Sequence, residues 1–401
     1  MPQRVFRDDD TLVWAYKYGD GSANAKVFNT TKTIDASDGA NYGTLTGTLG
    51  ATTGPTNLAD GTYNLPCQIV QEQGTGATDT VNNELNFLTT VVSGVATFRY
   101  PFTKNWNTGA QFITANPFLT IIVNSGVSIS PPAWNGSTGG RLFLIAKNSI
   151  TGVDNTSIFQ STGSGFRGGN GGNHGFNSSD VQSTQGESNL GVGTYSNAAN
   201  GAGGGGSDGS GSDGGNGGGG AGYGTTGSNG GAGQGSIGVG GGTDGSANML
   251  NMSLGNGGGG GRGEKNGNGN GGNGGRGGGF ITLISPTISG VVLLINGQVG
   301  SDASFTSSDG AGGGGAGSGG GALLKGTKIT LGSNDTANGA SGGAPGVGSA
   351  GTGGASGVGR FHVDILLNDA QHITGSTSPT YDVAVQACLN NLTGGGILAM
   401  I

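Results

Sequence analysis

The fold is decided by the sequence GGGGGRG at residues 257–263, GGNGGRGGG at 271–279 and the aliphatic FITLI that follows directly at 280–284. Ordering a glycine costs about 1–2 kcal/mol of backbone entropy, the largest such loss of any residue. A glycine tract is therefore typical of a flexible linker. Here, however, such tracts alternate with aliphatic strands rather than joining two complete domains. We therefore expect ordered, extended polyproline-II-like strands that pack side by side and exchange amide hydrogen bonds.

The composition agrees with a fold held together by its backbone. Glycine supplies 96 of the 401 residues, charged residues make up 10% and hydrophobic residues 32%. Such a chain buries little large apolar surface, so its cohesion must come from backbone hydrogen bonds and close backbone packing. Proline is present at only 10 positions and the glycines lack a strict collagen period, which excludes a collagen triple helix.

A repeated theme marks the aliphatic islands between the glycine tracts. A glycine entry is followed by an apolar strand, a polar break and a second short strand, and the last three entries lie about 40 residues apart. This spacing predicts repeats that stack to build one core. The entries are Gly140-Arg141, Gly279-Phe280, Gly321-Ala322 and Gly359-Arg360.

The chain divides by composition into four regions, and strand-like runs rather than helical periodicity dominate it. The predicted fold is all-β with very little α-helix: short strands at the N-terminal side, then β-solenoid-like repeats combined with a polyglycine-II helix bundle. The regions are an N-terminal attachment or β module at 1–62, a β-strand-rich domain at 63–160, the glycine-rich repeat region at 161–365 and a C-terminal cap at 366–401.

Charge and patterning exclude several function classes. The net charge is −7 and the 16 Lys and Arg residues form no basic stripe, which argues against nucleic-acid binding. No run of about 18 apolar residues predicts a membrane span. The N-terminal ten residues lack an apolar signal-peptide segment, although the composition looks extracellular. A virion protein is made in the host cytoplasm and works outside after lysis, so it would combine an extracellular composition with the lack of a signal peptide. A trimmed signal or an unconventional secretion route would explain the same combination.

No catalytic, cofactor or metal motif emerges. The histidines at 174, 362 and 372 lack zinc spacing, and no Gly-X-Gly-X-X-Gly match sits in a βαβ context. Cys67 and Cys388 lie far apart without redox spacing, and whether they pair is left open. We expect a non-enzymatic protein with no cofactor and no bound metal.

The glycine tracts resemble the glycine-rich motifs of the distal tail-fibre adhesins of T-even-type phages. The tracts are 203–206, 217–220, 257–263 and 271–279. The resemblance implies polyglycine-II helices packed into a sandwich, with loops between the glycine motifs that touch a bacterial receptor. The chain departs from that family in its length, its β-type N-terminal half and its aliphatic islands, which look more like coils of a parallel β-solenoid.

If the loops act in this way, the bulky residues stranded among glycines are the candidate receptor contacts, because a glycine scaffold needs no aromatic side chain at a tip whereas recognition does. The alternative is that each one fills a gap in the bundle. The candidates are Phe166, Arg167, His174, Phe176, Tyr195, Tyr223, Met249, Leu250, Met252 and Leu254.

The leading prediction is a phage virion fibre or receptor-binding adhesin, located on the virion. Its expected partners are other virion proteins or copies of itself, as a homo-oligomer, and a host surface protein or glycan. The second prediction is a self-assembling filament or surface protein, secreted or held at a cell surface. The third is an ice-binding protein, although no regular Thr-X-Thr array is present.

Overall fold

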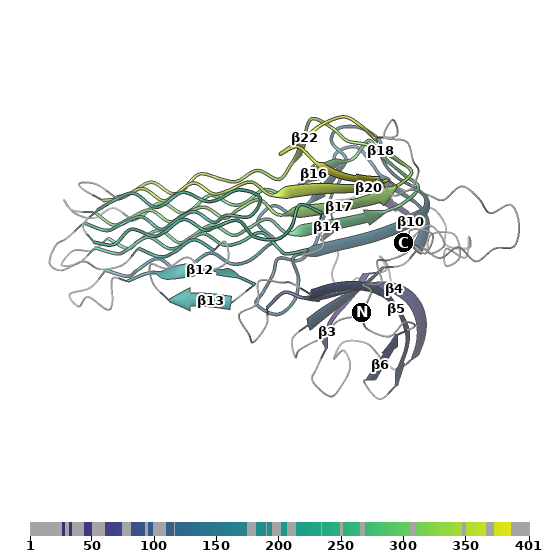
Figure 1. The fold of residues 1–401 in the computed structure, drawn as a ribbon, viewed down its shortest axis with the longest axis horizontal. Helices are drawn as coiled ribbons and strands as arrows, with labels where there is room; N and C mark the ends of the chain where they lie inside the picture. Colours follow the sequence, from purple (N-terminus) through teal and green to yellow (C-terminus); the bar gives the residue numbers. More distant parts are fainter. Residues whose placement is uncertain are drawn as a thin grey trace, which may run out of the picture.

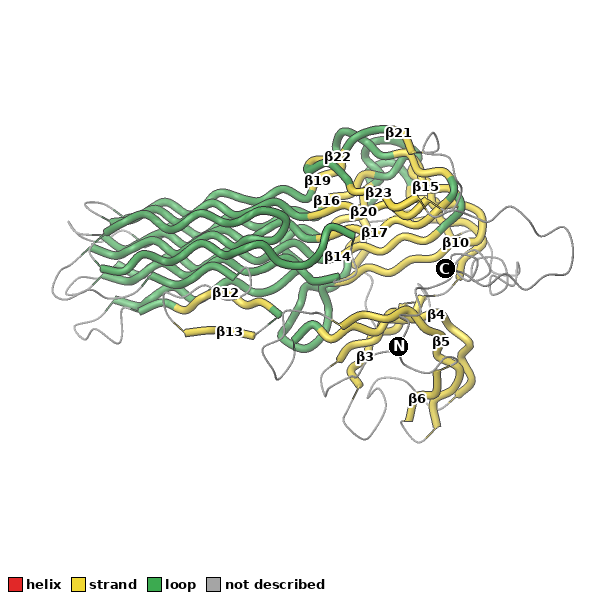
Figure 2. Tube along the Cα trace, viewed as in Figure 1, coloured by secondary structure: helices red, strands yellow, loops and turns green. Residues whose placement is uncertain are grey.

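A computed structural model of the chain describes residues 26–28, 32–33, 44–49, 61–73, 82–92, 95–98, 110–115, 117–174, 182–189, 191–194, 202–206, 214–233, 235–248, 252–264, 269–304, 310–346, 350–365 and 373–385. These residues form β-strands and no helix, which confirms the predicted all-β class. The strands make curled sheets, and long segments outside the strands extend away from them to one side (Figure 1, Figure 2).

One sheet is antiparallel and lies beside the rest of the β-structure (Figure 1). Its buried residues, among them Phe87 and Ile113, pack against Phe143 and Ile145 of the neighbouring parallel sheet. Its strands, in spatial order, are β3 (Thr44–Leu49), β7 (Ala110–Ala115), β4 (Gly61–Gln71), β5 (Asn82–Val92) and β6 (Val95–Phe98).

Two further sheets contain only parallel pairs and share one core. The ten-stranded sheet comprises β1 (Lys26–Phe28), β8 (Pro117–Val123), β10 (Arg141–Gly152), β14 (Phe280–Ile284), β15 (Thr287–Ser289), β17 (Gly321–Gly326), β18 (Lys328–Thr330), β20 (Arg360–Ile365), β21 (Ile373–Thr374) and β23 (Asp382–Val385). The six-stranded sheet comprises β2 (Lys32–Thr33), β9 (Ser128–Ser130), β11 (Ile158–Gln160), β16 (Val292–Leu294), β19 (Asp335–Thr336) and β22 (Thr377–Ser378). The pair β12 (Thr184–Ser188) and β13 (Gly191–Thr194) is separate and antiparallel.

The parallel sheets are built from strand–turn–strand units stacked in register. Arg141 pairs with Phe280, Phe280 with Gly321, and Gly321 with Arg360. These positions lie at the predicted glycine entries, except that the third unit aligns at Gly321, one residue before the predicted Ala322. The repeat thus corresponds to one stacked unit. A row of isoleucines follows the same stack through the core: Ile121, Ile150, Ile288, Ile329 and Ile373.

Alternation along each strand decides which side chains enter the shared core. On β10, Leu142 and Leu144 point into it, whereas Phe143 and Ile145 point outward to the antiparallel sheet. All five residues of β14 are buried because both of its faces are covered, which explains the unbroken apolar run at 280–284.

Long glycine-rich segments are inserted at one corner of the stacked units. They connect β11 to β14, β16 to β17 and β19 to β20, and they lie side by side beyond the ends of the strands (Figure 1). We call them the glycine bundle. Its described runs are 163–174, 182–189, 202–206, 214–233, 235–244, 252–264, 269–279, 295–304, 310–320, 337–346 and 350–359.

Hydrogen bonds between the runs recur every third residue. The amides of Phe166, Gly169 and Gly172 donate to the carbonyls of Gly255, Gly258 and Gly261 (3.0, 2.8 and 2.9 Å). The amides of these three glycines donate in turn to Gly278, Gly275 and Gly272 (2.8, 2.9 and 2.8 Å). Most buried backbone groups of the bundle are therefore paired between runs rather than within one run.

The sheet pairings cross two boundaries predicted from composition. Strands β10 and β11 pair with β14 and β16, so the division at 160–161 falls inside one set of stacked units. Strands β21 to β23 continue the same sheets beyond 365. Composition changes there because the glycine insertions begin and end, while the stacking continues through both positions.

Candidate recognition surface

Three of the predicted contact residues are buried where the bundle meets the sheets. Phe166, Met252 and Leu254 pack in one cluster with Trp134, and the Trp134 and Phe166 rings meet edge to face at 5.8 Å between centroids. A receptor does not reach these side chains in this fold. The alternative, that each one fills a gap in the bundle, describes them better.

Tyr223 is also buried rather than presented at a tip. Its hydroxyl donates to the carbonyl oxygen of Ser253 at 2.9 Å, and the Arg360 guanidinium lies 5.8 Å from its ring centroid. Burial raises the pKa of Tyr223 well above its ordinary value of 10.0, so its phenol stays protonated and donates this hydrogen bond. Its role is to fasten the bundle to the sheets.

Arg167 and His174 are exposed and lie on the same run, 163–174. The Arg167 Nε donates to Glu187 Oε2 at 2.9 Å, so this guanidinium is held in one orientation although its side chain is 45% exposed. The backbone amide of His174 donates to Asn270 Oδ1 at 2.8 Å, and its Nδ1 lies 2.9 Å from the same oxygen.

These two residues belong to a larger exposed surface built on three adjacent runs. Runs 163–174, 269–279 and 295–304 are joined by backbone hydrogen bonds, and each presents polar side chains outward at three-residue spacing. We call this surface the polar face. It consists of Arg167, Asn170, Asn173, His174, Asn270, Asn273, Arg276, Gln298, Ser301 and Ser304.

Some of these side chains cap amides that no neighbouring run can reach. Asn273 Oδ1 accepts from the amide of Gly171 at 2.8 Å, and the Ser304 hydroxyl accepts from the amide of Asn270 at 2.6 Å. An outer run lacks a neighbour on its solvent side, so Asn and Ser replace the missing carbonyl. The same contacts connect the three runs of the polar face to one another.

The charge of the polar face is set by one buried carboxylate below it. Burial by itself raises the pKa of Glu187, but hydrogen bonds from the side chain and backbone of Arg167 and from Gln73 outweigh burial and lower it. Glu187 therefore stays ionised and neutralises Arg167. The paired Arg167 therefore adds no net charge to the polar face.

The remaining candidates, Phe176, Tyr195, Met249 and Leu250, lie outside the described residues, as does Cys388. Cys67 is buried. Within the described ranges no helix is long and apolar enough to span a membrane, and no three His, Cys, Asp or Glu side chains gather as metal ligands.

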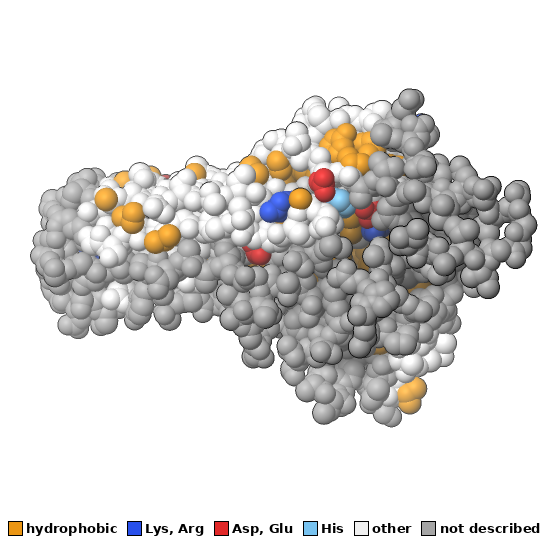
Figure 3. Space-filling model, in the orientation of Figure 1, with side chains coloured by type: hydrophobic (Ala, Val, Ile, Leu, Met, Phe, Trp, Pro, Cys, Tyr) orange, Lys and Arg blue, Asp and Glu red, His pale blue; other side chains and the backbone are white. Residues whose placement is uncertain are grey.

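The search for isolated bulky residues missed most of the polar face. Asn273 and Arg276 follow pairs of glycines in GGNGGRGGG, and this Gly-Gly-X period was the available signal. The two glycines face neighbouring runs while the third residue faces solvent. Figure 3 shows one face of the molecule, on which the described surface is mostly backbone and side chains that are neither hydrophobic nor charged. No family model, curated protein or solved structure matches this chain.

Proposed function

We propose that the glycine bundle is a set of polyglycine-II helices and that the stacked units form a β-solenoid. The three-residue recurrence of the hydrogen bonds between runs supports the first assignment, because polyproline-II geometry has three residues per turn. The in-register parallel stacking of repeated units supports the second.

We further propose that the protein is a non-enzymatic phage virion fibre or receptor-binding adhesin. The observation that carries this proposal is a hydrogen-bonded bundle that extends away from the β-sheets (Figure 1) and carries the polar face on three of its runs. The bundle projects from the sheets, is held together by backbone hydrogen bonds and carries hydrogen-bonding side chains at regular spacing. These features suit reversible attachment to a host surface protein or glycan. The β-sheets then serve as its base.

Cryo-electron microscopy of the native assembly tests the location. We expect the chain on a tail or capsid, with the glycine bundle pointing outward. A helical array made of this chain alone would instead identify the filament-forming alternative.

Binding of the purified full-length chain to host cells tests the polar face. Ser301→Glu places a carboxylate on this face, and we expect binding to fall at least tenfold, because an unpaired charge is desolvated on contact. Ser236→Glu is the matched control, since Ser236 is an exposed serine on a different run. Equal binding by wild type and both variants would reject the polar face as the contact surface, and absence of all cell binding, together with absence from virions, would reject the adhesin.

The filament alternative has one favourable observation. Among the described strands, β1 and β23 each pair on one side only, at opposite ends of the ten-stranded sheet, and all strands of that sheet run in the same direction. Such ends can add copies head to tail. Light scattering over a wide concentration range distinguishes the filament from the adhesin. A particle mass that grows with concentration supports the filament, whereas a constant particle mass supports the adhesin.

A further inference from the structure

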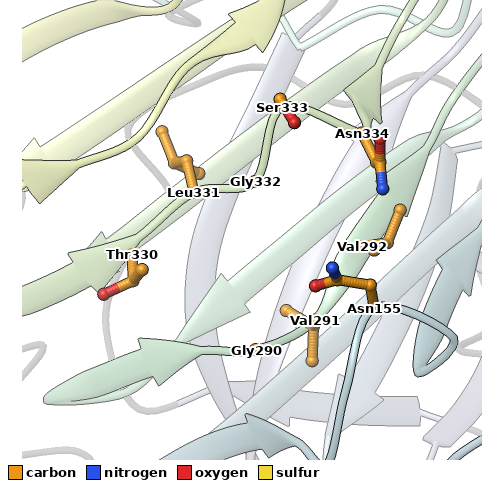
Figure 4. A pocket seen from close by; sticks show the side chains of 9 residues that line it. All are labelled: Asn155, Gly290, Val291, Val292, Thr330, Leu331, Gly332, Ser333 and Asn334. Carbon is orange, nitrogen blue, oxygen red and sulfur yellow. The ribbon is translucent and has the colours of Figure 1, made fainter.

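A notch opens where three successive stacked units turn from the ten-stranded to the six-stranded sheet. The outer two turns, at 153–157 and 331–334, are long, whereas the middle turn consists of Gly290 and Val291 alone. The difference in turn length leaves a gap above the middle unit. Figure 4 shows the residues that line it.

Gly290 allows the middle turn to stay short, so that it lies below the two flanking turns. Its φ of +68° is a conformation that other residues rarely adopt, and a Cβ there would lie 2.4 Å from the carbonyl oxygen of Gly152. The notch is thus specified by the chain rather than left over between loosely packed loops.

The chemistry of the notch is apolar below and polar at the sides. Val291, Val292 and Leu331 form its floor, and each is 5% exposed. Asn155 and Asn334 stand on the flanking turns, both exposed, and neither amide side chain hydrogen-bonds to another described residue. The cavity has a volume of about 230 Å³, and none of its nine lining residues is charged.

One wall is held in place by a buried carboxylate. Asp335 accepts a hydrogen bond from the amide of Gly332 at 2.8 Å, within its own turn, and another from the amide of Leu293 at 2.8 Å, on the neighbouring unit. These bonds fix the turn that carries Asn334 relative to the floor. The notch is therefore formed before any ligand arrives.

We propose that this notch binds one neutral sugar unit. A pyranose has an apolar C–H face that matches the floor, and hydroxyl groups around its rim that match the amides of Asn155 and Asn334. The uncharged lining disfavours phosphate, carboxylate and metal ligands, which require opposite charge. The site lies apart from the polar face and does not depend on the proposed function. A small ligand with these few contacts binds with a dissociation constant on the order of millimolar.

Saturation-transfer NMR on the full-length chain, with a panel of neutral methyl glycosides, tests the proposal. We expect at least one glycoside to bind with its C–H face receiving the most saturation. The double variant Asn155→Ala/Asn334→Ala should weaken that binding about tenfold, and Ser333→Trp, which fills the notch, should abolish it. Asn229→Ala is the matched control, an exposed asparagine of the glycine bundle outside both the notch and the polar face, and its loss should leave glycoside binding unchanged.

Thermal unfolding curves establish that each variant is folded. No binding by any methyl glycoside at tens of millimolar would overturn the proposal, as would binding that persists in both notch variants. Loss of glycoside binding with cell attachment retained would show two separate sites. Failure of cell attachment with glycoside binding retained would reject only the adhesin.

Discussion

Single glycines on run 252–264 face different neighbours in turn. A Cβ on Gly257 or Gly260 would meet the carbonyl oxygens of Arg167 or Asn170 at 1.9 or 2.1 Å. A Cβ on Gly261 would meet that of Gly312 at 2.0 Å. The centre of this run is thus surrounded by backbone, which is why all positions from 257 to 261 are glycine.

Replacement of one such glycine should therefore be strongly destabilising. We expect Gly261→Ala to lower the free energy of unfolding by about 2–4 kcal/mol, because the added methyl group must displace the backbone of run 310–320. Gly242→Ala is the control in the same bundle, since a Cβ there meets nothing within 4 Å. Its effect should stay within about 1 kcal/mol. Equal losses in chemical denaturation would contradict this account.

Asp335 makes the stability of the folded chain depend on pH. Burial raises its pKa from 3.8 to about 6, while hydrogen bonds from Leu293 and Gly332 oppose the shift. The protonated carboxyl is therefore favoured in the folded chain. Its contribution to stability is complete below pH 3.8 and is lost as pH rises through about 6.

We expect the stability of the wild type to fall by up to about 3 kcal/mol between pH 4 and pH 7.5 from this group. Asp335→Asn keeps the shape without the charge and should flatten that part of the profile. Urea denaturation at a series of pH values measures the difference between the two proteins. Identical profiles would show that Asp335 does not titrate in this range.

At the scale of elements, each strand of the stack is held by its neighbour, and a side-chain contact also holds the last described strand. His362 on β20 places Nε2 3.0 Å from Asp364 Oδ1 and Nδ1 3.0 Å from Asp382 Oδ2 on β23. Burial raises the pKa of Asp364, but the contacts with His362 and Lys325 outweigh it and lower the pKa. An ionised Asp364 thus helps His362 to bridge the two strands.

Removal of this bridge should loosen β23 alone. Asp382 is 48% exposed, so solvent screens the pair, and we expect Asp382→Ala to speed amide exchange in 382–385 by up to about fivefold. Exchange in β20 should not change. Thr380→Ala, at an exposed position nearby, serves as the control in hydrogen-exchange mass spectrometry. Equal exchange of 382–385 in both variants would mean that the bridge does not hold the strand.

At the scale of the whole molecule, the bundle and the stacked units are one structure. The insertions leave the stack at three connections, yet their runs hydrogen-bond to one another: the amide of Gly275 donates to Gly315, and that of Gly313 to Gly351. Tyr223 and Arg360 join the bundle to β20. Loss of one part therefore removes the support of the other.

We expect a single cooperative unfolding transition by calorimetry. Gly261→Ala in the bundle and Ile288→Ala in the sheet core should both shift that same transition to lower temperature. Ile288→Ala should do so because it leaves a cavity in the core, which lowers the free energy of unfolding by about 2–5 kcal/mol. Two transitions, with each variant moving only one, would show that the bundle and the stack unfold independently.

The all-β class and the approximate spacing of the repeats follow from local properties of the sequence, because β-branched and aliphatic runs favour strands and a glycine entry precedes each run. The exact register does not: Phe280 pairs with Gly321, one residue before the predicted alignment with Ala322. The composition boundaries at 160–161 and 365–366 fall inside the stacked units, because composition reports the glycine insertions and not the strand pairing.

Only the tertiary structure decided which residues are accessible. Phe166 and Tyr223 look isolated among glycines in the chain, but Trp134 and Arg360 come from distant segments to pack against them. The polar face and the notch likewise join residues far apart in sequence. The side of a glycine run that faces solvent is the side without a neighbouring run. Where the neighbours lie is a property of the packed bundle rather than of the run itself.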